Sequence, residues 1–256
     1  MNILIKKLIK LLILLIINIR KKKYKYTKLG SDYGEWAFHN NFYSKPIVIS
    51  CGAGEDISFD IDFLNNFSGK VYLIDPTPRA ISHYNSIKKK FGDKKKINYE
   101  KGGNQPISSY NLIRINSSNL KLINKAIWNK NQLLKFYPPK DNNFVSFSLF
   151  KNKNTVGNFI KVQGMEILTI MKKIKIKKID LIKLDIEGAE LFVIEDLFKK
   201  NVLPNQILFE FDQLKEGSLT SLFYLFKFFK LINKYKYDLF YSDAKNNFSI
   251  IKESVN

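Results

Sequence analysis

From residue 46 onward, short apolar runs alternate with segments of helix length, and this alternation constrains the fold more than any other feature. It is typical of an α/β domain with a largely parallel sheet, because parallel strands are joined by crossover helices. Strands are predicted at residues 47–50, 71–74, 122–128, 180–185, 206–211, 237–241 and 248–252. Helices are predicted at 57–67, 78–91, 167–173, 189–200 and 218–234.

Only a short Asp-Ala-Lys-Asn-Asn segment separates the last two predicted strands, so we expect them to form an antiparallel hairpin. The prediction is therefore seven strands, with one reversed at the end. At 256 residues the chain is long enough to bury one full core. The segments 98–119 and 138–144 are predicted loops because they are rich in turn-forming residues.

The first predicted strand ends in a glycine turn, within the stretch PIVISCGAGEDISFD (residues 46–60). Gly52, Ala53 and Gly54 form the turn, and Glu55 and Asp56 open the following helix. Glycine turns before helices usually bind phosphate, but two carboxylates would repel a phosphate. The turn also lacks the third glycine of a dinucleotide fingerprint and the lysine of a P-loop.

The next strand ends at Asp75, 21 residues beyond Gly54. An acid at about this position contacts the ribose hydroxyls of a nucleoside in this architecture. A ribose-binding acid, a glycine turn and further carboxylates together favour a nucleoside with a cationic amino-acid end, such as S-adenosylmethionine. Each acid also has a structural interpretation: Asp56 as a helix cap, Glu55 as a complement to the helix dipole and Asp75 as a turn former.

The stretch KIDLIKLDIEGAELFVIEDL (residues 178–197) places charges within a predicted central strand. With period two, Lys183, Asp185 and Glu187 share one face. Buried charges need partners, and Lys183 and Asp185 are candidates to neutralise each other. Asp185 and Glu187 come where the strand ends, and ligands in open α/β sheets bind beyond the carboxyl ends of strands. Glu210, with Asp212, would extend this acidic wall from the following strand.

The same stretch resembles the D-x-x-K-x-D-x-E-G-x-E signature of FkbM-type S-adenosylmethionine-dependent methyltransferases. The matching residues are Asp180, Lys183, Asp185, Glu187, Gly188 and Glu190. VISCGAGEDISFD resembles the family's cofactor loop, and KAIWNKNQLLKFYPP resembles its third-strand segment and following hairpin. Covering about residues 30–252, the resemblance implies a Rossmann-like class I methyltransferase fold, with a seven-stranded, mostly parallel sheet and a C-terminal antiparallel hairpin, in a domain spanning residues 29–256.

The resemblance also implies roles for individual residues. The cofactor would be held by Gly52, Ala53, Gly54, Glu55, Asp56 and Asp75, with Ala126, Ile127 and Trp128 lining its adenine. Trp128 has the alternative of being a core aromatic. Ser50 stands where methyltransferases of this fold commonly carry an acid for the methionine end, so Glu55 or Asp56 is expected to replace it.

Members of this family typically methylate hydroxyl groups, often on sugars or glycolipids, so a small-molecule or glycan acceptor is expected. An alcohol must lose its proton as it is methylated, and Asp185 is the first candidate for the base or acceptor-orienting group, with Glu187 and Glu210 behind it. Lys183 would favour the charged form of Asp185. His39 and His83 are alternative bases. A divalent cation held by the three acids is compatible with the sequence but not required by it.

Residues 1–28 hold nine basic side chains and no acidic one around a short apolar run. As a helix, residues 11–19 span roughly 14 Å, short of the roughly 30 Å hydrocarbon core of a bilayer. We expect an interfacial or signal-anchor helix on an anionic membrane surface, with the basic cluster after it keeping the domain at the cytoplasmic face. An ordinary basic leader or packing helix is the alternative.

The net charge of +20 raises the possibility of a nucleic-acid-binding protein, such as an RNA methyltransferase. Only three of the 43 basic residues are arginine, the residue favoured for base and phosphate recognition, so no nucleic-acid partner is expected. A third possibility is a catalytically decayed fold that only binds glycolipid. Two histidines and one cysteine leave no pattern for a zinc site or a disulfide framework. The loops 98–119 and 138–158 are expected to select the acceptor.

Overall fold

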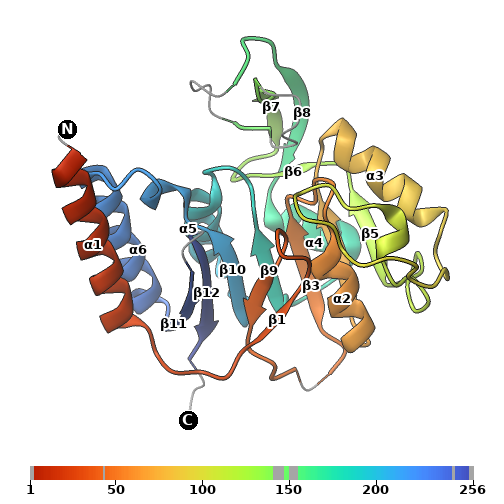
Figure 1. The fold of residues 1–256 in the computed structure, drawn as a ribbon, viewed down its shortest axis with the longest axis horizontal. Helices are drawn as coiled ribbons and strands as arrows, with labels where there is room; N and C mark the ends of the chain where they lie inside the picture. Colours follow the sequence, from red (N-terminus) through yellow and green to blue (C-terminus); the bar gives the residue numbers. More distant parts are fainter. Residues whose placement is uncertain (1–2, 43, 141–146, 150–154, 244–245, 254–256) are drawn as a thin grey trace.

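The computed structural model describes residues 3–42, 44–140, 147–149, 155–243 and 246–253. A seven-stranded sheet lies at its centre, in the order β11-β12-β10-β9-β3-β4-β5 (Figure 1). Its strands are β3 (Ile47–Cys51), β4 (Lys70–Ile74), β5 (Leu120–Ile123), β9 (Leu181–Leu184), β10 (Gln206–Glu210), β11 (Tyr237–Ser242) and β12 (Asn247–Lys252). Only β12 runs against its neighbours. The predicted mostly parallel sheet and C-terminal hairpin are confirmed.

The five predicted helices are present, with ends within a few residues of the prediction. They are α2 (Ser58–Asn66), α3 (Pro78–Lys88), α4 (Ile167–Ile174), α5 (Glu190–Lys199) and α6 (Leu219–Lys234). Alternate residues of β9 show how they cover the sheet: Ile182 and Leu184 pack in one core cluster with α4, α5 and α6, whereas Leu181 packs in the other with α2 and α3. Period two therefore buries both faces of the central strands.

The order of the strands creates a crevice. The chain runs outward from β3 to β4 and β5 and later returns to place β9 directly beside β3. The connections that leave β3 and β9 therefore lead in opposite directions, and such a switch point is where open α/β sheets bind ligands.

The predicted strand at 122–128 is in fact two strands. β5 ends at Ile123, and a tight turn, in which Lys125 N donates to Ile123 O at 2.8 Å, directs β6 (Ala126–Ile127) away from the main sheet. β6 joins β8 (Ile160–Met165), which also pairs with β7 (Gln132–Phe136). This three-stranded sheet rises above the carboxyl end of the main sheet (Figure 1).

The N-terminal segment forms α1 (Ile3–Arg20), which lies beside α6 at the outer edge of the molecule (Figure 1). Ile9, Ile13 and Ile17 are buried in the same core cluster as α6. Within the described residues, none of the helices combines the length and the apolarity needed to cross a bilayer.

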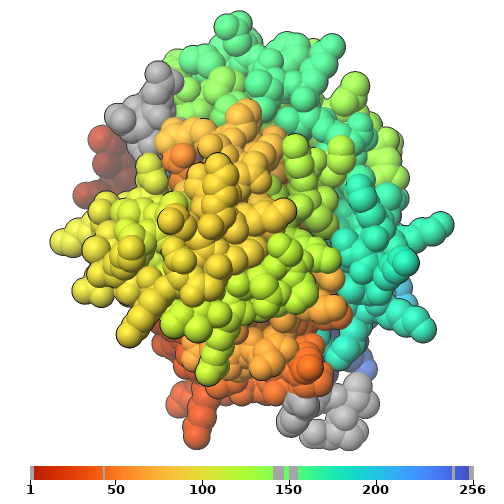
Figure 2. Space-filling model, turned by 90° about the vertical axis from the view of Figure 1, so that its right-hand side faces the viewer, coloured from red at the N-terminus to blue at the C-terminus, as the bar shows by residue number. Residues whose placement is uncertain are grey.

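A strand pair that the sequence did not predict follows α1. β1 (Thr27–Leu29) pairs antiparallel with β2 (Trp36–Phe38), and Phe38 packs against Phe59 and Phe63 of α2. Two short 3-10 helices, η1 (Ile107–Ser109) and η2 (Asp212–Leu214), complete the described elements. At the opposite end from α1, α3 and the segment after it form much of the surface (Figure 2).

Candidate functional site

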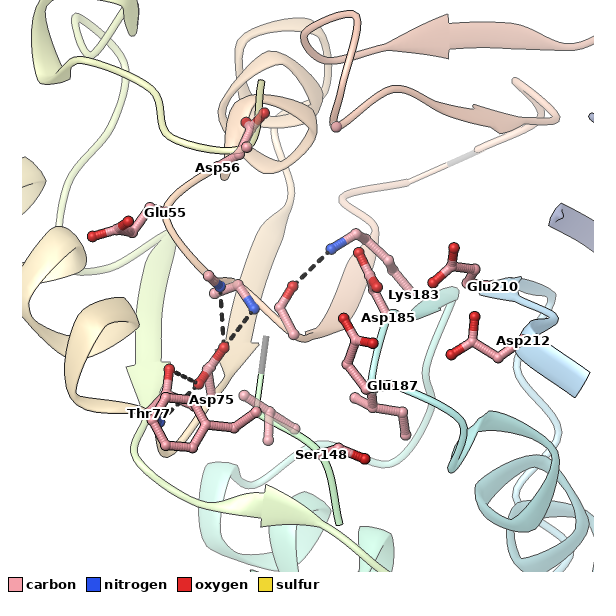
Figure 3. Close-up of a pocket in the computed structure, with 18 of the residues that line it drawn as sticks. Glu55, Asp56, Asp75, Thr77, Ser148, Lys183, Asp185, Glu187, Glu210 and Asp212 are labelled. Carbon is pink, nitrogen blue, oxygen red and sulfur yellow. Dashed lines mark hydrogen bonds between the residues drawn. The ribbon is translucent and has the colours of Figure 1, made fainter. Parts of the chain in front are cut away.

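A cavity of about 880 Å³ lies at the carboxyl ends of the central strands. Ligand pockets typically measure roughly 300–1,000 Å³, so this cavity lies toward the upper end of that range. All predicted site residues line it except Trp128 and the alternative bases His39 and His83. Asp75 and the glycine turn lie on one side, and Asp185, Glu187, Glu210 and Asp212 lie on the other (Figure 3).

The two sequence motifs are in backbone contact. Gly52 and Asp185 directly follow the paired residues Cys51 and Leu184 of β3 and β9, and Asp185 N donates to Cys51 O at 3.1 Å. Gly52 has a φ of +81°, and a Cβ there would lie 1.8 Å from Asp185 O. The glycine is therefore required both for its left-handed backbone and for the approach of the second motif.

Lys183 of β9 binds the glycine turn through a hydrogen bond. Its side chain is buried, its Nζ donates to Gly52 O at 3.1 Å (Figure 3), and the ammonium lies 5.5 Å from the centre of the Trp36 ring. No ion pair joins Lys183 to Asp185 in the described residues, so the hypothesis that the two neutralise each other by direct contact is wrong. The lysine acts on Asp185 at longer range, where it favours the charged carboxylate.

Asp185 presents a carboxylate that accepts no hydrogen bond from any described residue, which leaves its oxygens open to a ligand. Burial raises its pKa; the charge of Lys183 opposes that shift, and Asp212 adds to it. Asp185 therefore binds a proton more tightly than an ordinary aspartate does.

Glu187 belongs to a strained turn. Glu187 and Gly188 have φ values of +56° and +96°, and a left-handed non-glycine residue costs roughly 1–2 kcal/mol. Glu190 holds the turn, since its Oε1 accepts from Ile186 N at 2.9 Å and Gly188 N at 3.2 Å. The last acid of the signature is therefore structural, and it fixes the backbone from which Glu187 projects.

Glu210 and Asp212 share one ammonium group. Lys215 Nζ lies 2.8 Å from Glu210 Oε1 and also pairs with Asp212. Burial raises the pKa of Glu210 to about 8, with the charges of Asp185 and Asp212 adding to the shift and Lys215 opposing it. Near neutral pH Glu210 is therefore mostly protonated and can donate a hydrogen bond.

Asp75 is saturated by its own neighbours. Oδ2 accepts from Ala53 N at 2.9 Å and Gly54 N at 3.1 Å, and Oδ1 accepts from Thr77 N at 2.8 Å and Thr77 Oγ1 at 2.7 Å (Figure 3). A carboxylate offers about four lone-pair sites. A ribose hydroxyl that donates to Asp75 would therefore share its oxygens with the glycine turn.

The two acids expected to replace the missing acid at position 50 have protein partners. Glu55 pairs with Arg79 of α3. Asp56 accepts from Ser31 Oγ at 2.5 Å and from Ser58 N at 2.9 Å, but the N-cap residue of α2 is Ile57, so Asp56 lies one residue before the cap position. Glu55 and Asp56 both line the cavity.

A further acid, which was not predicted from the sequence, lies in α2 and interacts with Lys183 and Ser50. Asp60 of α2 is fully buried, and neither its carboxylate oxygens nor the Ser50 hydroxyl has a hydrogen-bond partner of good geometry in the described residues. Burial raises the pKa of Asp60 to about 6, while Lys183 and Ser50 favour its charged form. Asp60 thus supplies a negative charge near the buried lysine.

Three predicted candidates lie elsewhere. Trp128 is not among the lining residues, because β6 has left the main sheet, and it packs beside Ala126 and Leu134 instead. His39 Nδ1 lies 2.6 Å from Lys25 O, and His83 Nε2 lies 3.0 Å from the Tyr110 hydroxyl. Neither histidine lines the cavity.

The aromatic side chains that do line it include Tyr33, Trp36 and Phe136. Tyr33 and Trp36 come from the unpredicted β1–β2 segment, and Phe136 comes from the end of β7. A local pattern gives no sign of them, because they reach the site only through packing. In the part of the chain that the structure describes, no three histidine, cysteine or acidic side chains form a group suited to a metal ion.

With this geometry established, comparison with known proteins gives a family. The family model described as the Methyltransferase FkbM domain matches residues 50–239, which include both the glycine turn and the acidic motif. The chain belongs to the FkbM methyltransferase family. This FkbM domain is therefore a methyltransferase domain, as its sequence signature predicted.

Other comparisons are more distant. A crystal structure of monomeric WbdD aligns with this FkbM protein at a TM-score of 0.41 and 9% identity, over 81% of this chain and 36% of that one. The present chain thus spans about a third of the length of that protein. A search of curated proteins found no match.

Proposed function

We propose that this protein is an S-adenosylmethionine-dependent methyltransferase that methylates a hydroxyl group of a sugar, glycan or glycolipid. The observation that carries the proposal is that the glycine turn and Asp75 line the same cavity as Asp185, Glu187 and Glu210.

The charge of the cavity supports a cationic ligand. Its described lining carries seven carboxylates and three lysines, whereas the whole chain has a net charge of +20. A locally negative cavity attracts a sulfonium with an ammonium group and repels a polyanion. This contrast favours a sulfonium nucleoside over nucleic acid as the occupant of the cavity.

The cofactor side fits the residues present. Asp75, which keeps its bonds to the amides of Ala53 and Gly54, would contact the ribose, and Ala126 and Ile127 offer apolar surface for the adenine. S-adenosylmethionine, when bound, supplies the methyl group that is transferred.

On the acceptor side, an alcohol O–H bond breaks while an O–CH₃ bond forms and the S–CH₃ bond breaks. Asp185 accepts the proton, since its carboxylate is open and its pKa is raised. Protonated Glu210 donates to a neighbouring hydroxyl and orients the sugar. Orientation supplies several kcal/mol, and a positioned base adds roughly 10²- to 10⁴-fold in rate.

The test has two measurements. Titration calorimetry should show S-adenosylmethionine binding to the wild-type protein, and mass spectrometry of glycans from cells with and without the protein should show loss of a methyl ether in its absence. Absence of cofactor binding overturns the proposal. If the protein binds the cofactor but the glycans are unchanged and another class of molecule is methylated, the methyltransferase activity stands and the proposed glycan acceptor is rejected.

A further inference from the structure

Helix α1 has apolar side chains on two opposite faces. Ile9, Ile13 and Ile17 form the inward stripe and are buried in the core. Leu8, Leu11, Leu15 and Ile19 recur at helical spacing on the outward side, where each is more than half exposed. A surface helix normally turns polar residues to water, and a helix that is apolar all round is usually covered on every side. The outward stripe therefore lacks the cover that its composition requires.

Helix α6, which contacts α1, also carries exposed apolar side chains. Leu219, Phe223 and Phe226 form a stripe with exposed fractions of 70%, 63% and 58%. The two helices are fixed to each other, because Arg20 Nη2 donates to Asn233 Oδ1 at 2.8 Å and its guanidinium lies 5.0 Å from the Phe229 ring centre. We define the apolar face as the exposed stripes of α1 and α6, and these two helices lie side by side at one edge of the molecule (Figure 1).

The charged side chains on the two helices themselves all have one sign. Neither α1 nor α6 contains an acidic residue. Lys6, Lys7 and Lys10 of α1 are exposed and form no ion pair with any described residue. Lys230 and Lys234 are exposed on α6. A large apolar patch bordered by lysines is complementary to lipid chains below and anionic head groups around them.

We propose that the apolar face docks on the surface of an anionic membrane, with α1 and α6 lying in the interface. The buried inward stripe holds α1 on the domain, so the helix lies along the membrane as part of the folded protein. A second copy of the chain is a poorer occupant, because a two-fold contact would bring the same lysine-bordered patch against itself. The membrane-binding surface predicted from residues 1–28 alone would thus also include α6.

The face also reaches toward the cavity. Lys10 packs against Gly217, where a Cβ would lie 2.3 Å from Lys10 Cγ, and Gly217 is two residues beyond Lys215, which lines the cavity. Docking therefore places the acidic side of the site near the membrane, where a lipid-linked acceptor would be available.

The test is co-sedimentation of the full chain with vesicles. We expect the protein to bind vesicles of phosphatidylcholine that contain about 30% phosphatidylglycerol. Binding should be at least about tenfold weaker to pure phosphatidylcholine, and it should weaken as the salt concentration is raised. The double variant Leu11→Gln/Phe223→Gln should bind the anionic vesicles at least tenfold less. Leu133→Gln is the matched control, because Leu133 is 67% exposed on β7, away from the face, and it should bind as the wild type does.

Exposed positions are chosen because deletion of α1 would also uncover its core contacts; an unchanged thermal midpoint verifies that the variants fold. Equal vesicle binding by the wild type and the double variant overturns the proposal. A second result would also overturn it: the wild type binds no vesicles and forms a stable dimer in sedimentation equilibrium, and the double variant is a monomer. The occupant of the apolar face would then be a second copy of the chain.

Discussion

At the scale of single residues, the site depends on contacts between two short motifs far apart in the sequence. Gly52 allows the backbone of Asp185 to approach, Lys183 holds the Gly52 carbonyl, and Glu190 fixes the turn that carries Glu187. Asp185 lines the cavity and accepts no hydrogen bond from the described protein, which is why we assign it the proton transfer.

Asp185→Asn should reduce methyl transfer by about 10²- to 10⁴-fold and leave affinity for S-adenosylmethionine within about threefold, because the amide keeps the shape but cannot accept the proton. Single-turnover kinetics and calorimetry measure the two effects. Asp93→Asn, on the surface and outside the cavity lining, serves as the control. Retained turnover in Asp185→Asn would show that another group is the base.

Gly52→Ala should destabilise the fold by more than about 4 kcal/mol, since its methyl would meet Asp185 O in addition to the backbone strain. Gly92→Ala is the matched control: φ there is +93° and a Cβ would meet nothing within 4 Å, so it should lose only about 1–3 kcal/mol. Urea denaturation gives both values. Equal losses would mean that the approach of Asp185 is not required.

Glu210 should make stability depend on pH. Its pKa is raised from 4.5 to about 8 in the folded protein, so the folded state binds more protons than the unfolded state between these values. Its contribution is present below pH 4.5 and is lost as pH rises through about 8. The unfolding free energy of the wild type should therefore fall across this range relative to Glu210→Gln. Parallel pH profiles of the two proteins would contradict the raised pKa.

At the scale of elements, α1 is a packed part of the domain and not a loose leader. Ile13→Ala should cost about 2–4 kcal/mol because Ile13 is 4% exposed. Leu11→Ala, two residues earlier on the same helix and 66% exposed, should change stability by less than about 0.5 kcal/mol. Urea unfolding distinguishes the two; negligible loss in both variants would mean that α1 detaches in solution.

The sequence predicted the central elements well because each has a strong local signal. Period two marks the strands buried on both faces, and helical spacing marks the crossovers between them. β7 and β8 gave weaker signals, since they form a small sheet of their own, and the strand at 122–128 was predicted as one because a two-residue turn cannot be recognised within an apolar run.

At the scale of the whole molecule, an acidic cavity lies in a strongly basic protein. The attraction of the cavity for a cation is short-ranged and partly shielded from solvent. Affinity for S-adenosylmethionine should therefore change by less than about threefold between about 50 and about 300 mM salt. Nonspecific RNA binding through the surface lysines should fall by orders of magnitude over the same range. Salt-sensitive RNA binding without cofactor affinity would favour the nucleic-acid alternative.

By itself the sequence determined the alternating α/β core, the two motifs at the ends of their strands and the family signature, because all of these are written in local order and spacing. Only the tertiary structure decided that Lys183 bonds to the Gly52 carbonyl instead of Asp185, that Asp60 is buried and interacts with Lys183, and that Tyr33 and Trp36 reach the cavity. A buried charge takes whichever partner the packing of distant segments brings near it, and spacing along the chain does not encode that choice.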